Sequence, residues 1–271
     1  MFAKDLFKDK VALVTGGRSG IGYGIARDML QMGATVYIGS RKEEPLQKAA
    51  EELAEYGDIH YQALDIRQTE QIQAMAKKIK DEQGRLDILV NNAGGQFPAL
   101  AEMINDKGWN AVINNNLNGT FYMIREMGNA FFLPQKGGVI INIIADMFRG
   151  FPGMIHTGAA RAGVENLTKT LAVEWSEYRI RINSVAPGTI ESSGLSTYPP
   201  QIQAMFKAAE EAVPLGRFGT VEDVSNAVCF LASPLAEYIS GICLYVDGAS
   251  HLNSDKMGLP TVLKSFMKPN K

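Results

Sequence analysis

The sequence predicts one α/β domain built on a doubly wound parallel sheet of seven strands, with helices on both faces. Short β-branched runs alternate with longer stretches that carry apolar residues at three- and four-residue spacing. The runs are apolar almost throughout, as strands covered on both faces must be. No linker, repeat or low-complexity tract interrupts this alternation before residue 252. Such an alternation favours a parallel sheet with right-handed crossovers.

Each predicted strand is a short apolar run between two helical or polar stretches. The seven strands are Val11–Thr15, Thr35–Ser40, His60–Asp65, Asp87–Ala93, Gly138–Ile144, Arg181–Pro187 and Ile242–Gly248. The clearest helical patterns between them are Pro45–Tyr56, Thr69–Gln83 and Gly108–Phe132. Residues 1–251 are expected to form the domain, and residues 252–271 a C-terminal tail that docks on it, enters a subunit interface or frays.

Composition excludes several classes of protein. The chain has 271 residues, 46% of them hydrophobic and 21% charged, which is ordinary for a globular domain. The net charge of −2 gives no excess of positive charge that would indicate nucleic-acid binding. No apolar run approaches the roughly 18 residues of a membrane span, and the start MFAKDLFKDK lacks a signal-peptide region. Cys229 and Cys243 are interpreted as buried thiols, although one disulfide remains open. We expect a cytoplasmic protein without a metal site.

A glycine-rich turn follows the first predicted strand directly and opens a helix. Missing side chains let the backbone approach a pyrophosphate at the helix N-terminus, where unpaired N–H groups favour anions. A tight turn that binds nothing is the alternative, but the position after the first strand favours a dinucleotide. The candidate cofactor contacts in this turn are Gly16, Arg18, Ser19, Gly20, Ile21 and Gly22.

The end of the second predicted strand indicates which dinucleotide binds. A free ribose 2′-hydroxyl is usually held by Asp or Glu at this place, yet the sequence here is Ser40, Arg41 and Lys42. Arg18 in the glycine turn adds a further cation. Because guanidinium groups pair bidentately with phosphate, we predict NADP(H) over NAD(H). The alternative is that Arg41 and Lys42 form a solvated strand end.

Six motifs in order, spanning nearly the whole chain, resemble those of the short-chain dehydrogenase/reductase family. They are TGGRSGIG at Thr15–Gly22, LDI at Leu64–Ile66, NNAG at Asn91–Gly94, NLNG at Asn116–Gly119, RINSVAPGTI at Arg181–Ile190 and YVDG at Tyr245–Gly248. The resemblance implies a Rossmann-like fold, a dimer or tetramer, and a lid over the substrate at residues 191–214. Met205 and Phe206 in that segment suit an acyl chain, or a helix packed on the body.

The resemblance also implies further cofactor contacts. Asp65 and Ile66 are expected to flank the adenine, and Asn92, Ala93 and Gly94 to line the cofactor cleft. The nicotinamide amide is expected to be held by Pro187, Gly188, Thr189 and Ile190. Ser192 occupies a position where the family often has a threonine that contacts the cofactor. Asn116 is expected to support a helix kink and a proton-relay water.

The chain departs from the family at the catalytic centre, where the usual set is Asn, Ser, Tyr and Lys. Alignment of ARAGVENLTKTLAVEW places Thr157 at the tyrosine position, Arg161 at the lysine position and Ile144 at the serine position. None of the nine tyrosines has a lysine four residues later, so no shifted Tyr-Lys pair replaces the missing one. Of the four family residues only Asn116 is present.

These replacements favour a reaction that needs no acidic phenol. A threonine hydroxyl is too weak an acid to replace tyrosine, and arginine stays charged. Thr157 still donates a hydrogen bond to an oxygen that becomes negative, while Arg161 adds positive charge and grips the nicotinamide ribose. Reduction of an α,β-unsaturated acyl thioester, with hydride going to Cβ and charge to the thioester oxygen, fits these groups. NNAGGQFPA, GWNAVINNNLNGTFYM and HTGAARAGVENLTK are similar to peroxisomal trans-2-enoyl-CoA reductases, with 2,4-dienoyl-CoA reductases as more distant relatives.

Two nearby residues have open roles. Asp146 is either the acid that protonates Cα or a carboxylate that orients its loop, paired with Arg149, and the second interpretation is favoured. His156 is interpreted as a polar residue at a helix start, and no chemistry is assigned to it.

Two other functions stay open beside NADPH-dependent enoyl thioester reduction. One is an NADP-dependent dehydrogenase or reductase of a hydrophobic alcohol or aldehyde, and the other is a nucleotide-binding protein with low turnover. The candidate catalytic residues for the favoured function are Thr157, Arg161, Asn116 and Asp146.

Overall fold

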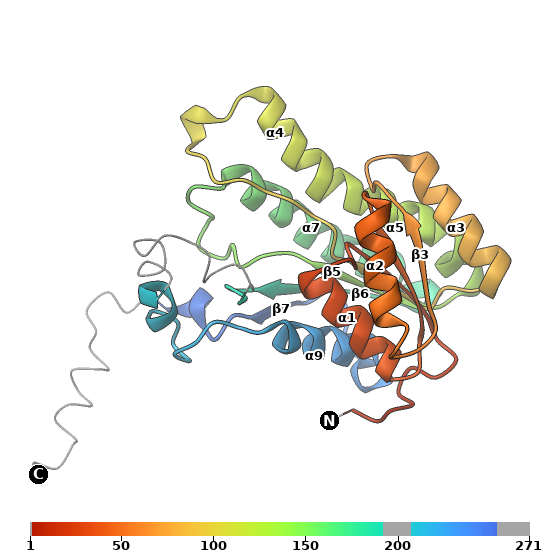
Figure 1. Cartoon of the computed structure of the whole chain (residues 1–271). Coiled ribbons are helices and arrows are strands. Elements are labelled where there is room, and N and C mark those ends of the chain that lie inside the picture. Colours follow the sequence, from red (N-terminus) through yellow and green to blue (C-terminus); the bar gives the residue numbers. More distant parts are fainter. Residues whose placement is uncertain (1, 192–206, 254–271) are drawn as a thin grey trace, which may run out of the picture.

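A seven-stranded, wholly parallel sheet forms the centre of the molecule (Figure 1). The computed structural model describes residues 2–191 and 207–253. The strands are β1 (Val11–Thr15), β2 (Thr35–Ser40), β3 (Ile59–Ala63), β4 (Ile88–Asn91), β5 (Gly138–Ile143), β6 (Ile180–Pro187) and β7 (Cys243–Val246). Their order is β3-β2-β1-β4-β5-β6-β7, and the predicted fold class is confirmed.

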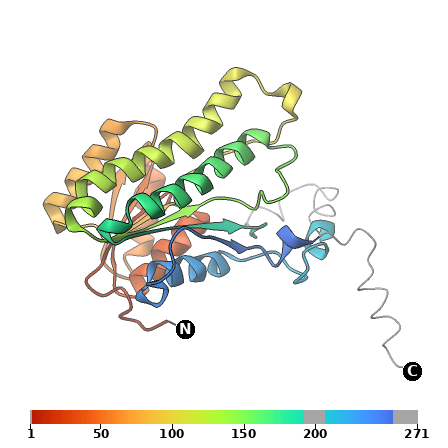
Figure 2. The ribbon, with the colours of Figure 1, turned by 180° about the vertical axis from the view of Figure 1, so that it is seen from behind.

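Helices cover both faces of the sheet, as Figures 1 and 2 show from opposite sides. One face packs against α1 (Gly20–Gln31), α2 (Glu43–Leu53) and α9 (Val221–Ala232). The other packs against α3 (Thr69–Gln83), α5 (Gly119–Met127) and α7 (Ile155–Glu174). Successive side chains of a strand point to opposite faces, so Ala12 and Val14 enter the first core and Leu13 the second.

Shorter elements complete the described parts of the chain. They are η1 (Ala101–Met103), α4 (Asp106–Ile113), η2 (Asn114–Asn118), η3 (Gly128–Phe132), α6 (Leu133–Gln135), η4 (Ser176–Tyr178), η6 (Pro234–Ala236) and η7 (Ser250–Leu252). None of the helices in residues 2–191 and 207–253 is long and apolar enough to cross a bilayer.

The boundaries of several elements differ from the prediction for local reasons. Helix α2 begins at Glu43 rather than Pro45, because acidic residues suit the first turn and proline is tolerated there. The predicted helix over residues 108–132 is a continuous run from α4 to η3, interrupted by π-helical turns at η2 and η3. Such turns are rare and occur often at functional sites, and η2 contains Asn116.

The sheet order locates the cleft. The chain leaves β1 toward β2 and β3 on one side, and β4 continues toward β5, β6 and β7 on the other. Ligands of open α/β sheets bind where this direction changes, beyond the carboxyl ends of the strands. The switch point here lies between the ends of β1 and β4, that is, between Thr15 and Asn91.

Candidate active site

The turn between β1 and α1 has the backbone geometry of a phosphate cradle. Gly16 and Gly20 have φ angles of +71° and +58°, which side chains rarely tolerate. A β-carbon on Gly22 would stand 2.4 Å from Asn92 Nδ2, so the turn admits no side chain there. Ser19 precedes α1 without capping it through its side chain, which leaves the first amides of the helix to a ligand. The turn therefore fits a dinucleotide pyrophosphate.

Thr15 and Asn92 join the glycine turn to the end of β4. The Thr15 hydroxyl accepts hydrogen bonds from the amides of Asn92 and Ala93, at 3.0 and 2.9 Å. Asn92 Nδ2 donates in return to the Thr15 carbonyl at 2.9 Å. Sequence reasoning placed Asn92 and Ala93 in the cleft but missed Thr15, which holds both. These bonds fix the two walls of the cleft to each other.

A cavity of about 250 Å³ opens at this point. Ten of the predicted cofactor residues line it: Gly16, Arg18, Ser19, Ser40, Arg41, Asp65, Ile66, Asn92, Ala93 and Gly94. Leu64 and Asn115 line it as well and were not predicted as contacts. The signals for them were present, since Leu64 belongs to the LDI motif and Asn115 precedes Asn116. Arg18 and Arg41 add two cationic side chains to the lining that contains Ser40.

Asp65 has a partner that the sequence analysis did not foresee. Arg67 Nε donates to Asp65 Oδ1 at 2.8 Å and also contacts Oδ2. This hydrogen bonding lowers the pKa of the Asp65 carboxyl, which is therefore ionised at neutral pH. With its carboxylate held by Arg67, Asp65 forms a fixed edge of the cavity.

Arg161 is a buried cation without a hydrogen-bond partner for one of its nitrogens. Only 7% of the residue is exposed, and within the described residues Nη1 has no acceptor. Burial lowers its pKa to about 10, so the guanidinium keeps its charge at neutral pH. Because a buried unpaired charge is costly, the site fits a ligand that brings oxygen acceptors to it.

Gly94 brings Arg161 and Asn116 together. A β-carbon on Gly94 would lie 2.3 Å from Arg161 Nη2 and 2.8 Å from Asn116 Oδ1. Asn116 is itself fixed, because its Nδ2 donates to the Gly95 carbonyl at 2.7 Å and the Val112 carbonyl at 2.9 Å. The loop after β4, the π-helical turn η2 and helix α7 thus meet at one point.

Thr157 lies on the same face of α7 as Arg161, one helical turn earlier, and is fully buried. Its hydroxyl lies 3.3 Å from His156 Nδ1. Ile144, at the family's serine position, is also buried and packs with Met147, Val164 and Ala186. The sites of the usual serine and tyrosine are therefore occupied by an apolar side chain and a weak hydroxyl donor.

A buried polar network anchors α7 to the sheet, and the sequence analysis missed it. Asn91 Nδ2 donates to Asn142 Oδ1 at 2.9 Å, and Asn142 Nδ2 donates to Thr168 Oγ1 at 3.0 Å. Thr168 lies 2.7 Å from the Ser184 hydroxyl. The network runs from β4 through β5 to α7 and β6, and it fixes the helix that carries Thr157 and Arg161.

Asp146 makes local contacts rather than the predicted pair with Arg149. Its Oδ1 accepts a hydrogen bond from the Phe148 amide at 3.3 Å, and its own amide donates to the Pro187 carbonyl at 3.1 Å. Arg149 instead contacts the carbonyl of Asn253. The pairing was wrong because the C-terminal turn, far away in sequence, brings that carbonyl to Arg149. These contacts support the loop-orienting interpretation of Asp146.

The remaining predicted contacts do not line this cavity. They are Gly20, Ile21, Gly22, Arg161, Pro187, Gly188, Thr189 and Ile190. Thr189 and Ile190 hold the segment at Gly219, whose amide donates to the Thr189 carbonyl at 2.9 Å. Ser192, Met205 and Phe206, and with them most of the expected lid and tail, lie outside the described residues.

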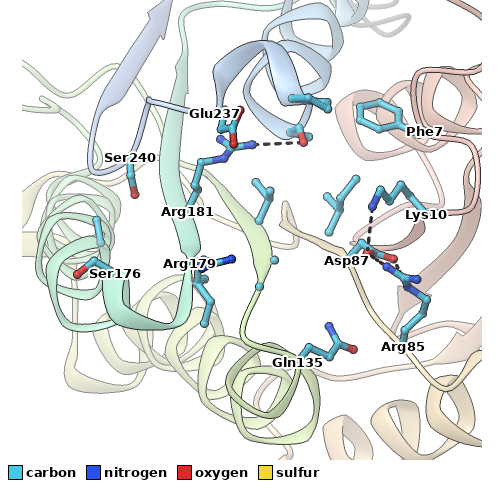
Figure 3. Close-up of a pocket in the computed structure, with 18 of the residues that line it drawn as sticks. Phe7, Lys10, Arg85, Asp87, Gln135, Ser176, Arg179, Arg181, Glu237 and Ser240 are labelled. Carbon is cyan, nitrogen blue, oxygen red and sulfur yellow. Dashed lines mark hydrogen bonds and ion pairs between the residues drawn. The ribbon is translucent and has the colours of Figure 1, made fainter.

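A larger hollow of about 1280 Å³ lies at the opposite edge of the sheet, near the starts of β4, β5 and β6 (Figure 3). Asp87 there pairs with Lys10 and Arg85, and Arg181 donates to the Leu231 carbonyl at the end of α9. None of the predicted site residues lines this hollow. It is separate from the cleft at the switch point.

The fold and the cleft define an α/β protein with a glycine-rich ligand site at the switch point of its sheet. The family profile described as enoyl-(acyl carrier protein) reductase matches residues 16–251. The chain belongs to this family, within the short-chain dehydrogenases/reductases, whose members generally use NAD(P)H.

Individual relatives agree with this membership. The chain is 38% identical over 247 residues to a probable 2,4-dienoyl-CoA reductase of Bacillus subtilis, covering 90% of this chain and 97% of the relative. It is 38% identical over 255 residues to a peroxisomal 2,4-dienoyl-CoA reductase of Rattus norvegicus, covering 92% and 86%. Among solved structures, a citronellol catabolism dehydrogenase of Pseudomonas aeruginosa is 41% identical with a TM-score of 0.83, covering 93% of this chain and 98% of that one.

Proposed function

We propose that this oxidoreductase is an NADPH-dependent reductase of an α,β-unsaturated acyl thioester, similar to a trans-2-enoyl-CoA reductase. The observation that carries the proposal is the buried pair of Thr157 and Arg161 on one face of α7, where the family usually has tyrosine and lysine. This pair steadies a negative oxygen but does not supply it with a proton.

The choice of NADPH rests on charge at the adenosine end of the cleft. Arg18, Ser40 and Arg41 line the cavity there. A 2′-phosphate offers acceptors to both guanidinium groups and to the hydroxyl, which a bare 2′-hydroxyl does not. The positive φ angles of Gly16 and Gly20 support a close approach of the pyrophosphate beside them.

The residues of the chain divide the chemistry between them. When bound, the dihydronicotinamide would supply the hydride that reaches Cβ, and a proton taken ultimately from solvent would complete the reduction at Cα. The Thr157 hydroxyl donates a hydrogen bond to the thioester oxygen, where charge collects as the enolate forms. Arg161 places positive charge beside that oxygen and holds the nicotinamide ribose. Asn116 fixes the loop at Gly95 and thus the wall against which Arg161 lies. Asp146 orients the loop after β5.

The relatives support an acyl thioester substrate. The names of two of them state that they reduce 2,4-dienoyl-CoA and that the product is an enoyl-CoA. Their substrates share with 2-enoyl-CoA a double bond conjugated to the thioester. We also propose that the protein is a cytoplasmic homo-oligomer, as family membership suggests.

One observation favours a second candidate function. The similarity to a citronellol catabolism dehydrogenase favours a hydrophobic alcohol or aldehyde as substrate. This reaction needs a proton relay to the carbonyl oxygen, and Thr157 and Arg161 are poor members of such a relay. We therefore rank it second.

Oxidation of NADPH with crotonyl-CoA, a long-chain 2-enoyl-CoA and a panel of ketones and aldehydes separates these functions. Turnover with the enoyl thioesters alone is expected. Turnover with ketones or aldehydes alone establishes the second function, and tight NADPH binding without turnover across the panel contradicts both. In Thr157→Val we expect kcat for the enoyl thioester to fall about 10²–10³-fold, the usual loss for one oxyanion donor. NADPH affinity is expected to stay unchanged.

A further inference from the structure

We propose that His156 is a positioning residue for Thr157: its neutral imidazole gives the Thr157 hydroxyl a resting acceptor that the hydroxyl leaves when a negative substrate oxygen arrives. This inference rests on the proposed function, in which Thr157 stabilises the enolate. His156 lies at the start of α7, as the sequence indicates, and the structure adds that the residue is fully buried.

The surroundings of His156 make a histidine at this position unfavourable for folding stability, so a purely structural role does not explain it. Its ring packs edge-on against Phe97, with the centroids 4.6 Å apart and the planes at 75°. Its Nε2 is buried and has no hydrogen-bond partner among the described residues. A buried polar atom without a partner costs free energy, which an apolar side chain of similar size avoids. Within the described parts of the chain, the one polar partner of the imidazole is Thr157.

The contacts with Thr157 define the state of the ring. The Thr157 amide donates to His156 Nδ1 at 2.8 Å and also lies 3.0 Å from the Met154 carbonyl oxygen. Because an amide only donates, Nδ1 carries the lone pair and Nε2 the proton of a neutral imidazole. The Thr157 hydroxyl lies farther from the same lone pair, at 3.3 Å. It is thus the weaker of two donors to Nδ1.

Two other buried helical threonines show what Thr157 does differently. The hydroxyls of Thr120 and Thr168 each donate to the main-chain carbonyl four residues earlier, at 2.9 Å. This is the ordinary arrangement for a helical threonine, and it commits the hydroxyl to the backbone. Thr157 makes no such bond, and His156 Nδ1 is the sole acceptor near its hydroxyl among the described residues.

A long contact to a shared acceptor suits a hydroxyl that must change partners. At rest the hydroxyl is not left unsatisfied. When a negative oxygen arrives, the charge-assisted bond to it is stronger than the bond it replaces. Nδ1 stays paired with the amide after the hydroxyl leaves. Without the imidazole, the hydroxyl is expected to turn to a carbonyl of the preceding turn, as in Thr120 and Thr168.

The protonation pattern of the ring tests the geometry without any turnover. The chain has three histidines, so two-bond ¹H–¹⁵N spectra of the full-length protein are assignable by substituting each in turn. We expect His156 to carry its proton on Nε2, with Nδ1 unprotonated. His251 is the internal control, because its Nδ1 lies 2.7 Å from an Asp247 carboxylate oxygen and must carry a proton to bond there. A proton on His156 Nδ1 overturns the proposal.

A double-mutant cycle tests the coupling. With an enoyl-CoA substrate, His156→Leu is expected to lower kcat about 10-fold with KM and NADPH affinity unchanged, since a misplaced group slows the chemical step. His156→Asn, whose Oδ1 replaces Nδ1 as acceptor, is expected to recover most of that loss. In the Thr157→Val background, His156→Leu is expected to have no further effect. His60→Leu, in β3 outside the site, is the matched control.

Each outcome decides between the alternatives. Equal losses on His156→Leu in both backgrounds show a structural role and contradict the proposal. If His156→Leu fails to fold, the proposal is tested instead by the activity of His156→Asn and by the ¹H–¹⁵N spectra of the His156 ring. If the native enzyme does not reduce enoyl-CoA, the proposed function fails, whereas the protonation state of His156 still reports on its contact with Thr157.

Discussion

The guanidinium of Arg161 lies against the backbone of Gly94, so close that a β-carbon on Gly94 would stand 2.3 Å from Arg161 Nη2. The contact joins helix α7 to the loop after β4, about 70 residues apart in the chain. A side chain at position 94 would therefore push the Arg161 guanidinium and the Asn116 amide away from this backbone, so the position of the guanidinium depends on the glycine.

Gly94→Ala is expected to displace Arg161 and weaken NADPH binding at least 10-fold, because about 1.4 kcal/mol of lost charge-assisted bonding gives that factor. Titration calorimetry measures the affinity, and circular dichroism confirms that the fold is kept. Gly137→Ala is the matched control, since a β-carbon there meets nothing within 4 Å. Equal affinities in Gly94→Ala and the native protein contradict the role of this contact.

Arg161→Met is expected to stabilise the ligand-free protein while weakening cofactor binding. Removing a buried cation with an unmatched donor recovers about 1–3 kcal/mol, and each kcal/mol raises Tm by roughly 2–4 °C in a chain of this size. Thermal melts without and with NADPH measure both effects. A lower Tm in the ligand-free variant shows instead that Arg161 serves stability.

Arg41→Ala is expected to weaken NADPH binding about 10–100-fold and to change NADH binding little, because the guanidinium is proposed to pair with the 2′-phosphate. Fluorescence titration with each cofactor gives the ratio of affinities. Arg85→Ala, an arginine at the opposite edge of the sheet, is the control for a loss of general positive charge. If both affinities fall equally in Arg41→Ala, the predicted NADP selectivity is wrong.

Asp223→Asn is expected to reduce stability at neutral pH but not in strong acid. Hydrogen bonds from Arg217 and from the Thr220 amide lower the pKa of Asp223 to about 2, from an ordinary value of 3.8. A carboxyl with a lowered pKa contributes stability above its ordinary pKa and loses it as the pH falls through the folded value. We expect a deficit of about 0.5–1 kcal/mol at pH 7 for this partly exposed pair. Urea unfolding between pH 7 and pH 2 should show the deficit shrinking, and a constant deficit contradicts the assignment.

The two thiols are expected to be inert in the folded protein. Burial raises the pKa of both Cys229 and Cys243 to about 12, so little thiolate is present at pH 8. Both are free, so no disulfide joins them, and Cys229 is buried as predicted while Cys243 is only partly buried. A colorimetric thiol assay should detect about two thiols after unfolding and almost none before it. Rapid reaction of the native protein contradicts this expectation.

Local sequence information was sufficient for most of the fold. The strands Val11–Thr15 and Thr35–Ser40 and the helix Thr69–Gln83 have the predicted bounds, because their apolar periods and their flanking residues lie within each segment. The glycine turn was predictable for the same reason, since its positive φ angles depend on the residues of the turn itself. The π-helical turns inside the run from α4 to η3 were not, because the apolar pattern of a helix barely changes across them.

By itself, then, the sequence determined the layers, the position of the glycine-rich turn and the absence of the usual tyrosine and lysine from α7. Only the tertiary structure decided which distant groups meet: Gly94 with Arg161, Thr15 with Asn92, and Arg149 with Asn253 rather than Asp146. It also decided that His156 is buried against Phe97. The physical reason is that burial and pairing depend on how helices and loops pack across the sheet. The residue pattern within one segment does not identify the distant segment that it will contact.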